Sequence, residues 1–418
     1  MANVFESYES NVRSYCRSFP TVFETAKGCL LTDKEGKTYV DFFSGAGGVN
    51  YGHNHPHIKE QVISYLQSDG IIHALDMYTG PKQDFIEYFQ KNILEPRGFE
   101  YKIQFTGPTG TNAVEAALKL ARKVTGRQNV FALMGAFHGM TMGSLALTTD
   151  RSSRDGAGVA LHNVTHVPAP YMFSGLDTLE YMETLITDDH SGVEKPAAVI
   201  LEAVQADGGI YPFSVEYLQG LRALCDRHDI LLIADDIQAG CGRSGNFFSF
   251  ERAGIVPDMV TVSKSIGGMG MPMALLLMKP QLDIWSPGEH TGTFRGNQLS
   301  FVAAKAGLQV FVTEEVAKQV AEKEALVADF LKNEIEPLHS GITTRGIGLI
   351  WGVDLSKLGG DALSKQVMQT CFKNGLVLER VGRDNAVLKL MPPLTIEKEN
   401  LLKGLNILKD VLAQIIKE

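Results

Sequence analysis

The chain has 418 residues, of which 44% are hydrophobic and 21% are charged, and its formal net charge at pH 7 is -9. This length exceeds what one compact core usually holds, so we expect a large domain and a smaller one. The acidic charge argues against nucleic acid or an anionic membrane as a partner.

The amino-terminal seventeen residues carry charges in every turn and contain no apolar stretch of signal-peptide length. Five cysteines, an odd number, are scattered without a CxxC pair, which disfavours a disulfide framework or a zinc site. No segment reaches the roughly 18 unbroken apolar residues of a membrane-spanning helix. We therefore expect a soluble, cytoplasmic protein without a metal site.

A turn-forming stretch, GPTGT at 107–111, precedes a helix that the sequence predicts over residues 112–124. The helical segment is rich in strong helix formers and places its apolar residues from Val114 to Ala121 on one face. A glycine-containing turn that opens a helix offers free N–H groups and the positive end of the helix dipole to an anion. The turn is a candidate phosphate site, although similar turns precede many helices for capping alone.

Short apolar runs alternate with helical lengths between about residues 100 and 280. Such runs of β-branched and aliphatic residues are typical of strands buried on both faces of a mostly parallel sheet. They predict an α/β layered domain. The predicted strands are 129–134, 197–204, 229–236, 258–264 and 272–278.

Two of these predicted strands end in charged residues. Asp235 closes the run ILLIAD, and Lys264 closes the next run, DMVTVSK. The 29 positions between them suit one strand–helix–strand crossover, which brings both side chains to the same edge of the sheet. An isolated aspartate there more often caps a helix, and an isolated lysine is usually at the surface. A lysine buried beside the glycine-rich SIGGMGMP would instead have a lowered pKa and act as a nucleophile.

The pattern changes from about residue 300 to longer amphipathic helices at 299–312 and 316–335. Short strands follow at 346–355 and 386–391, and a helix closes the chain near 397–416. We expect a smaller α+β domain built from residues 1–55 and 301–418, with residues 56–300 forming the large domain.

Five motifs in sequence order resemble those of class III aminotransferases, which have the fold of type I enzymes that use pyridoxal 5'-phosphate. The resemblance covers nearly the whole chain. The motifs are GPTGTNAVEAALKLAR, FHG at 137–139, ADDIQAGCGRSG at 234–245, SKSIGG at 263–268 and TFRGN at 293–297.

The resemblance implies a role for each matching residue. Lys264 would hold the cofactor aldehyde and carry a proton, and Asp235 would pair with the ring nitrogen and keep it protonated. The remaining cofactor contacts would come from Gly110 and Thr111 at the phosphate, Gln238 near the ring hydroxyl, Phe137 on the ring face with His138 beside it, and Thr293 at the phosphate of a neighbouring subunit.

The role of Thr293 implies a homodimer with shared active sites, or a tetramer of two such dimers. Each assignment has a plainer alternative: Phe137 could be a core residue, His138 a satisfied polar residue and Thr293 a turn residue. Cys241 is interpreted as structural because no base at a recognised spacing accompanies it.

A closer resemblance is to diaminobutyrate:2-oxoglutarate aminotransferases, which supply diaminobutyrate for ectoine, siderophores and peptide antibiotics. It rests on the opening segment 6–28, on DFFSGAGGVNYGHNHP at 41–56 and on residues 104–127. The implied reaction moves the amino group of glutamate to the terminal aldehyde of aspartate 4-semialdehyde. Its products are 2,4-diaminobutyrate and 2-oxoglutarate.

Two departures from related ornithine and γ-aminobutyrate enzymes bear on substrate binding. Met140 stands where those enzymes have an arginine that clamps a distal carboxylate. Lys389 stands where they have an arginine for the α-carboxylate of glutamate, and Glu202 corresponds to the glutamate that masks it. We predict that Glu202 and Lys389 form a switchable ion pair.

Three other functions are compatible with the same motifs. One is another ω-amino acid aminotransferase that uses pyruvate or 2-oxoglutarate as acceptor. The second is an aminomutase of the same fold, and the third is a silent binding protein. An intact Lys264, Asp235 and phosphate turn disfavour the silent protein.

Overall fold

The main sheet has seven strands in the order β4-β12-β11-β10-β7-β5-β6, in a computed structural model that describes residues 4–417. Neighbours from β11 to β6 run parallel, whereas β12 is antiparallel to both β11 and β4. The prediction of a mostly parallel sheet is confirmed. The strands are β4 (Lys102–Phe105), β5 (Val130–Leu133), β6 (Val164–Val167), β7 (Ala198–Leu201), β10 (Leu231–Asp235), β11 (Met259–Val262) and β12 (Leu275–Met278).

All five predicted strands lie in this sheet, and almost every residue in them is buried. Full burial of both faces explains why the sequence shows continuous apolar runs instead of alternation. The two strands that the sequence did not predict, β4 and β6, form the edges of the sheet. They carry polar residues such as Lys102 and His166, which weaken the apolar signal.

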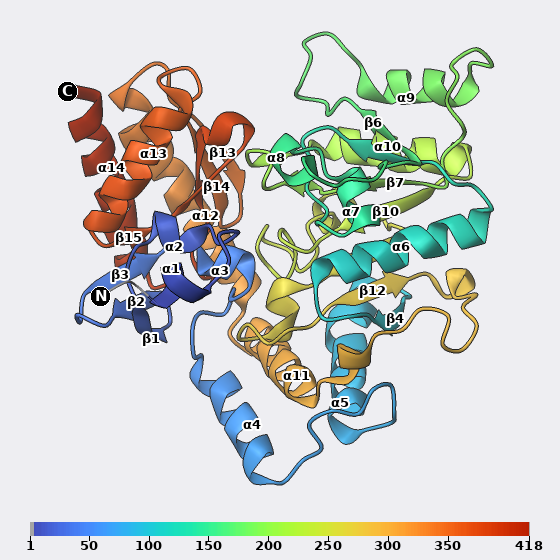
Figure 1. The fold of residues 1–418 in the computed structure, drawn as a ribbon, viewed down its shortest axis with the longest axis horizontal. Helices are drawn as coiled ribbons and strands as arrows, with labels where there is room; N and C mark the ends of the chain where they lie inside the picture. Colours follow the sequence, from blue (N-terminus) through green and yellow to red (C-terminus); the bar gives the residue numbers. More distant parts are fainter. Residues whose placement is uncertain (1–3, 418) are drawn as a thin grey trace.

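Helices cover both faces of the sheet (Figure 1). Helix α6 (Gly110–Thr125) begins two residues before the predicted start and buries the predicted face, including Val114 and Ala121. Gly110 and Thr111, which were expected in the loop before the helix, therefore form the first turn of α6. Around the sheet lie α7 (Met142–Leu147), α8 (Arg151–Arg154), α9 (Thr178–Thr187) and α10 (Val215–Arg227).

The amino-terminal strands pack with the carboxyl-terminal part of the chain, on the left in Figure 1. Strand β3 pairs in parallel with β15, so residues more than three hundred positions apart share one sheet. The predicted run 346–355 belongs to a hairpin of two strands, β13 and β14, with a turn at 348–349. Two four-stranded sheets result, β1-β2-β3-β15 and β13-β14-β17-β16. Their strands are β1 (Phe23–Lys27), β2 (Leu30–Asp33), β3 (Thr38–Asp41), β13 (Thr343–Ile347), β14 (Ile350–Asp354), β15 (Leu376–Val377), β16 (Glu379–Val381) and β17 (Val387–Leu390).

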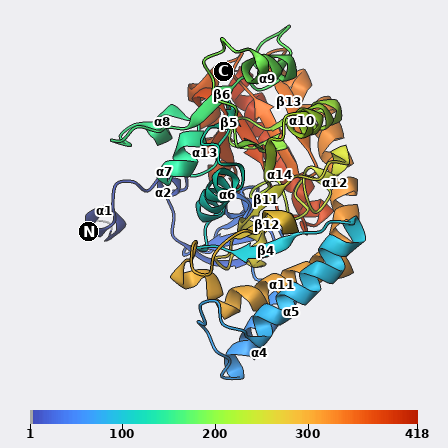
Figure 2. The same cartoon turned by 90° about the vertical axis from the view of Figure 1, so that its right-hand side faces the viewer.

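The long helices confirm the predicted change of pattern after residue 300. These are α11 (Gln298–Thr313), α12 (Val316–Phe330), α13 (Gly360–Lys373) and α14 (Lys398–Lys417). Helix α11 contacts α4 (Pro56–Gln67) and α5 (Gly80–Phe89), and the three lie together in the lower part of Figure 2. The exact domain boundaries stay a prediction. Within residues 4–417, no helix combines the length and apolar character that crossing a membrane requires.

Candidate active site

The two charged residues predicted at the strand ends meet at one edge of the sheet. Strands β10 and β11 are parallel neighbours with Asp235 opposite Thr261, and Lys264 follows two residues after β11. Asp235 and Lys264 both line a cavity of about 160 Å³. Lys264 has a φ of 54°, a left-handed backbone that is uncommon for a residue with a side chain and often occurs at functional sites.

Most of the predicted site residues surround the same cavity, although they come from segments far apart in the sequence. The cavity is lined by Gly110, Thr111, Phe137, His138, Glu202, Asp235, Gln238 and Lys264. Of the ten predicted residues, only Thr293 and Lys389 are not in its wall. The folding of the chain therefore brings together the groups that the motifs suggested.

Asp235 is held by three contacts. Its Oδ2 lies 2.6 Å from His138 Nδ1, and its Oδ1 accepts hydrogen bonds from Thr261 Oγ1 at 3.1 Å and the Ile237 amide at 3.2 Å. Burial alone would lower the pKa of His138, but the hydrogen bond and the charge of Asp235 outweigh it, and the pKa is raised. The three contacts fix the Asp235 carboxylate in the wall of the cavity.

Glu202 fixes the backbone beneath the cavity. It follows β7 directly, and its two carboxylate oxygens accept hydrogen bonds from the amides of Phe137 at 3.0 Å and Ala206 at 3.1 Å. Burial raises the pKa of Glu202 to about 7, with the nearby charge of Asp235 adding to the effect. Glu202 thus holds the segment that carries Phe137 and His138 against β7.

The amino-terminal end of α6 supplies the anion-binding part of the cavity. Gly110 and Thr111 form its first turn, where N–H groups lack helical partners. Thr111 Oγ1 is 2.6 Å from Thr141 Oγ1, which ties the turn to the segment after FHG. Gly139 has a φ of 126°, and a Cβ there would come within 2.6 Å of Thr111 Oγ1, so only glycine permits this approach.

These features fit pyridoxal phosphate. The first turn of α6, the Asp235 carboxylate and the Lys264 amine line one cavity and match its phosphate, ring nitrogen and aldehyde. The buried Nε2 atom of His138 has no hydrogen-bond partner. A polar atom in that position is accounted for by a group bound in the cavity.

Lys264 is chemically prepared for a nucleophilic role. Burial lowers the pKa of Lys264, and the negative charge of Asp207 is the strongest influence that opposes this effect. Lowering the pKa increases the fraction of neutral amine, which is the form that attacks a carbonyl carbon or accepts a proton.

The predicted ion pair between Glu202 and Lys389 is wrong. Lys389 Nζ lies 2.9 Å from Asp207 Oδ1 and 2.7 Å from Glu379 Oε2, and it donates to Gln238 Oε1 at 3.1 Å. The Glu202 carboxylate instead accepts hydrogen bonds from the backbone amides of Phe137 and Ala206. The sequence offered two acids in the segment after β7, and the second of them, Asp207, reaches Lys389 on β17.

Sequence reasoning also missed Glu379 and Tyr15. Glu379 begins β16, which pairs with β17 so that Glu379 lies opposite Lys389. The Tyr15 hydroxyl donates to Glu379 Oε1 at 2.9 Å. The usable signal was the pairing of β16 with β17, because residues directly opposite each other on two neighbouring strands are in contact range.

Thr293 lies away from the cavity of its own chain. It is exposed and starts a short helical turn, Thr293–Gly296. This position permits the predicted contact with a neighbouring subunit but does not test it. Cys241 is buried, and burial raises its pKa above the usual range, in agreement with a structural role.

A larger cavity of about 880 Å³ continues from the first one to the surface. Phe137, Asp207, Gln238 and Lys264 line both cavities, so the two form one site with an inner and an outer part. The outer cavity has room for a substrate beside the inner cavity that fits the cofactor.

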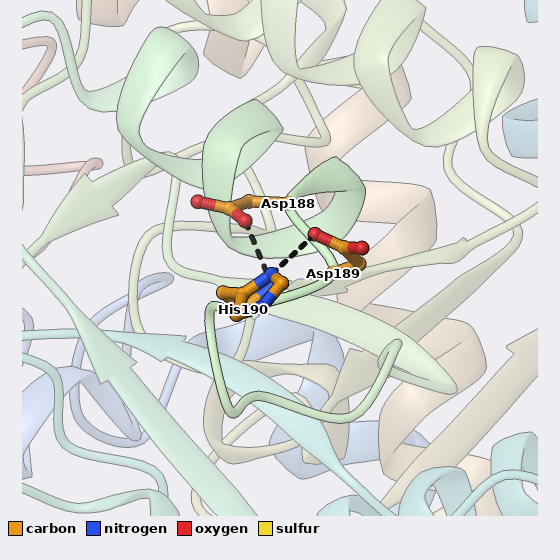
Figure 3. Close-up of side chains that lie close together, drawn as sticks. All are labelled: Asp188, Asp189 and His190. Atoms are coloured by element: carbon orange, nitrogen blue, oxygen red, sulfur yellow. Dashed lines mark hydrogen bonds and ion pairs between the residues drawn. The ribbon is translucent and has the colours of Figure 1, made fainter.

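One group of potential metal ligands occurs within residues 4–417, namely Asp188, Asp189 and His190 after α9 (Figure 3). His190 Nδ1 lies 2.6 Å from Asp189 Oδ1, and the His190 amide donates to Asp188 Oδ1. All three residues are exposed sequence neighbours, and none lines either cavity. Such exposed groups are common without an ion, and we assign no site to them.

Comparison with known proteins decides the family. Residues 13–412 match the family described as aminotransferase class-III. The chain belongs to this family. Class-III aminotransferases use pyridoxal 5'-phosphate, so the predicted reaction class and cofactor are confirmed.

Close relatives of this aminotransferase extend over its whole length. A diaminobutyrate--2-oxoglutarate transaminase of Bordetella parapertussis is 49% identical, with 99% of this chain and 96% of the relative covered. One of Wolinella succinogenes is 50% identical, with 99% and 97% covered. An uncharacterized aminotransferase of Sinorhizobium fredii is 49% identical, with 98% and 92% covered.

Solved structures share the fold of this aminotransferase. A Bacillus anthracis aminotransferase superposes with a TM-score of 0.87 at 26% identity, covering 98% of this chain and 97% of the other. The ornithine aminotransferase of Toxoplasma gondii gives a TM-score of 0.85 at 22% identity, covering 99% and 94%. The predicted fold is thereby confirmed.

Proposed function

We propose that the protein transfers the amino group of glutamate to the terminal aldehyde of aspartate 4-semialdehyde. The products are 2,4-diaminobutyrate and 2-oxoglutarate, and the reaction is reversible. The observation that carries the proposal is identity of about one half, over nearly the full length, to proteins named for this reaction. The arrangement of the cavity supports it.

The catalytic chemistry is assigned to a few residues. When bound, pyridoxal phosphate supplies an aldehyde that exchanges amino groups and a protonated ring that withdraws electrons from the reacting carbon. Lys264 Nζ would take the proton from the substrate carbon that bears the amino group and deliver it to the former aldehyde carbon of the cofactor. Asp235, which lies against His138 and accepts hydrogen bonds from Thr261 and the Ile237 amide, would hold the proton on the ring nitrogen.

The remaining cofactor contacts orient the ring. Phe137 and Gln238 line both the inner and the outer cavity, where they would contact the ring. Gly110 and Thr111 would bind the phosphate. Thr293 would reach the phosphate of a second subunit, which makes a homodimer the active unit. We assign the enzyme to the cytoplasm because its five cysteines are unpaired, as is usual in a reducing compartment.

The function is tested by half-reactions, in which an amine substrate converts the bound aldehyde to the amine form and changes the absorption spectrum. Glutamate and diaminobutyrate should convert the enzyme fast, and γ-aminobutyrate should leave it unchanged. Ornithine and alanine complete the series. Fast conversion by γ-aminobutyrate, with diaminobutyrate inert, would contradict the proposal and favour a general ω-amino acid aminotransferase.

Asp207 is assigned the masking role at Lys389. Asp207→Asn removes one of the two carboxylates that neutralise Lys389, so the lysine is freer to hold the α-carboxylate of glutamate. We expect the rate ratio of glutamate to diaminobutyrate half-reactions to rise about tenfold, equivalent to about 1.4 kcal/mol. Glu202→Gln is the matched control, because loss of the Glu202 carboxylate should slow both half-reactions equally. An unchanged ratio in Asp207→Asn would refute the switch.

A further inference from the structure

The outer cavity has an arginine, Arg383, whose guanidinium has no carboxylate partner in the described part of the chain. Four cationic residues line this cavity, namely Arg151, Lys264, Arg380 and Arg383. Arg380 binds Asp361, with Nη1 2.7 Å from Oδ1. Within residues 4–417, no carboxylate oxygen forms an ion pair with Arg151 or Arg383.

Lys389 cannot serve as a permanently free carboxylate site. An ammonium group has three N–H donors. Asp207, Glu379 and Gln238 each place an oxygen within 3.1 Å of Lys389 Nζ. A carboxylate that remains bound in both half-reactions therefore needs another cation.

Aromatic rings hold Arg383 in place. Its guanidinium carbon lies 5.7 Å from the centre of the Tyr171 ring. That ring stacks on Tyr211 with centroids 3.6 Å apart, and Arg345 covers the far face of Tyr211 at 4.0 Å. The Tyr171 hydroxyl donates to Gln205 Oε1 at 2.7 Å. Arg383 and Arg151 are both exposed, but of the two only Arg383 has an aromatic ring beside it among residues 4–417, and Arg151 lies on a four-residue helix.

The backbone presents Arg383 to the cavity. The turn after β16 has left-handed φ angles at Asp384 (54°) and Asn385 (49°), which cost energy unless the surroundings impose them. Gly382 N donates to Asp207 O at 2.9 Å, and Ser364 Oγ donates to Asn385 O at 2.7 Å. These bonds fix both ends of the turn.

Arg383 also lies close to the cofactor side of the site. A Cβ placed on Gly135 would be 3.6 Å from Arg383 Nη2, and Gly135 precedes Phe137 by two residues. Arg383 lines the outer cavity but not the inner one. Its position suits the end of a substrate that points away from Lys264.

We infer that Arg383 binds the distal carboxylate of the substrate in both half-reactions, an inference that rests on the proposed function. The γ-carboxylate of glutamate and the α-carboxylate of diaminobutyrate are separated from their reacting carbons by the same number of carbon–carbon bonds. One fixed guanidinium can therefore receive either by two parallel hydrogen bonds. Arg383, in the turn after β16, supplies the charge that Met140 lacks.

The test compares Arg383→Gln with wild-type holoenzyme. The KM values for glutamate and 2-oxoglutarate should each rise about 30-fold, with kcat changed much less, because a charged hydrogen-bonded contact is lost. Calorimetry should show a similar loss of affinity for glutarate, a dicarboxylate that cannot react. Arg383→Lys should recover part of the affinity, because the charge is kept and the fork is lost.

Arg151→Gln is the matched control and should leave the affinity for glutarate unchanged. A large effect in Arg151→Gln with none in Arg383→Gln would overturn the inference. Equal glutarate affinity in wild type and Arg383→Gln would overturn it as well, even where the wild type catalyses the proposed reaction. A wild type that binds glutarate through Arg383 but converts neither amine would instead contradict the proposed function alone.

Discussion

Lys264→Ala should abolish transamination, with kcat reduced by at least about 10⁴-fold. Lys264 is assigned two roles, binding the aldehyde of the cofactor and transferring the proton. The two arginines of the outer cavity that have no carboxylate partner among residues 4–417, Arg151 and Arg383, cannot replace Lys264 as a base, because a guanidinium does not give up its proton. Rates of the glutamate half-reaction and the absorption spectrum of the purified enzyme provide the measurement.

Chemical rescue separates proton transfer from structural damage. Methylamine is small enough for the space left by the removed side chain and should restore part of the rate. Lys318→Ala is the control, because Lys318 is exposed on α12 and its side chain keeps 68% of its accessible surface. Wild-type kinetics in Lys264→Ala would refute the assignment. A similar loss in Lys318→Ala would show that any lysine change harms the enzyme.

The central part of the site was predictable because parallel strands end at one edge of a sheet. Apolar runs located β10 and β11, and their last residues then placed Asp235 and Lys264 near each other without coordinates. The same reasoning located α6 and its first turn. These elements are long or fully buried, so their signals in the sequence are strong.

The partner of Lys389 was not predictable in the same way. Glu202 and Asp207 lie in one short segment after β7, and only the path of that segment decides which carboxylate faces β17. Arg383 was missed for a related reason. Its position depends on left-handed angles at Asp384 and Asn385 and on rings from two distant segments. Neither leaves a periodic pattern in the sequence.

Asp235→Asn should slow both half-reactions by about 10²–10⁴-fold, the range expected when a group that controls a proton is lost. Asparagine retains an oxygen for Thr261 Oγ1 and the Ile237 amide, so the local fold should persist. The neutral amide, however, cannot stabilise a proton on the ring nitrogen. It also removes the charge that raises the pKa of His138, which should then fall.

Asp236→Asn provides the matched control for Asp235→Asn. Asp236 is the adjacent buried carboxylate, but it bonds the amide and hydroxyl of Ser249 and does not line the inner cavity. Burial raises the pKa of Asp236 to about 7, so much of it is already neutral and an amide should be tolerated. We expect near wild-type half-reactions and an unchanged spectrum for Asp236→Asn, against slow half-reactions and a shifted band for Asp235→Asn. Rates within tenfold of wild type in Asp235→Asn would mean that another group holds the proton, and the assignment of the ring-nitrogen end of the cavity would have to be reversed.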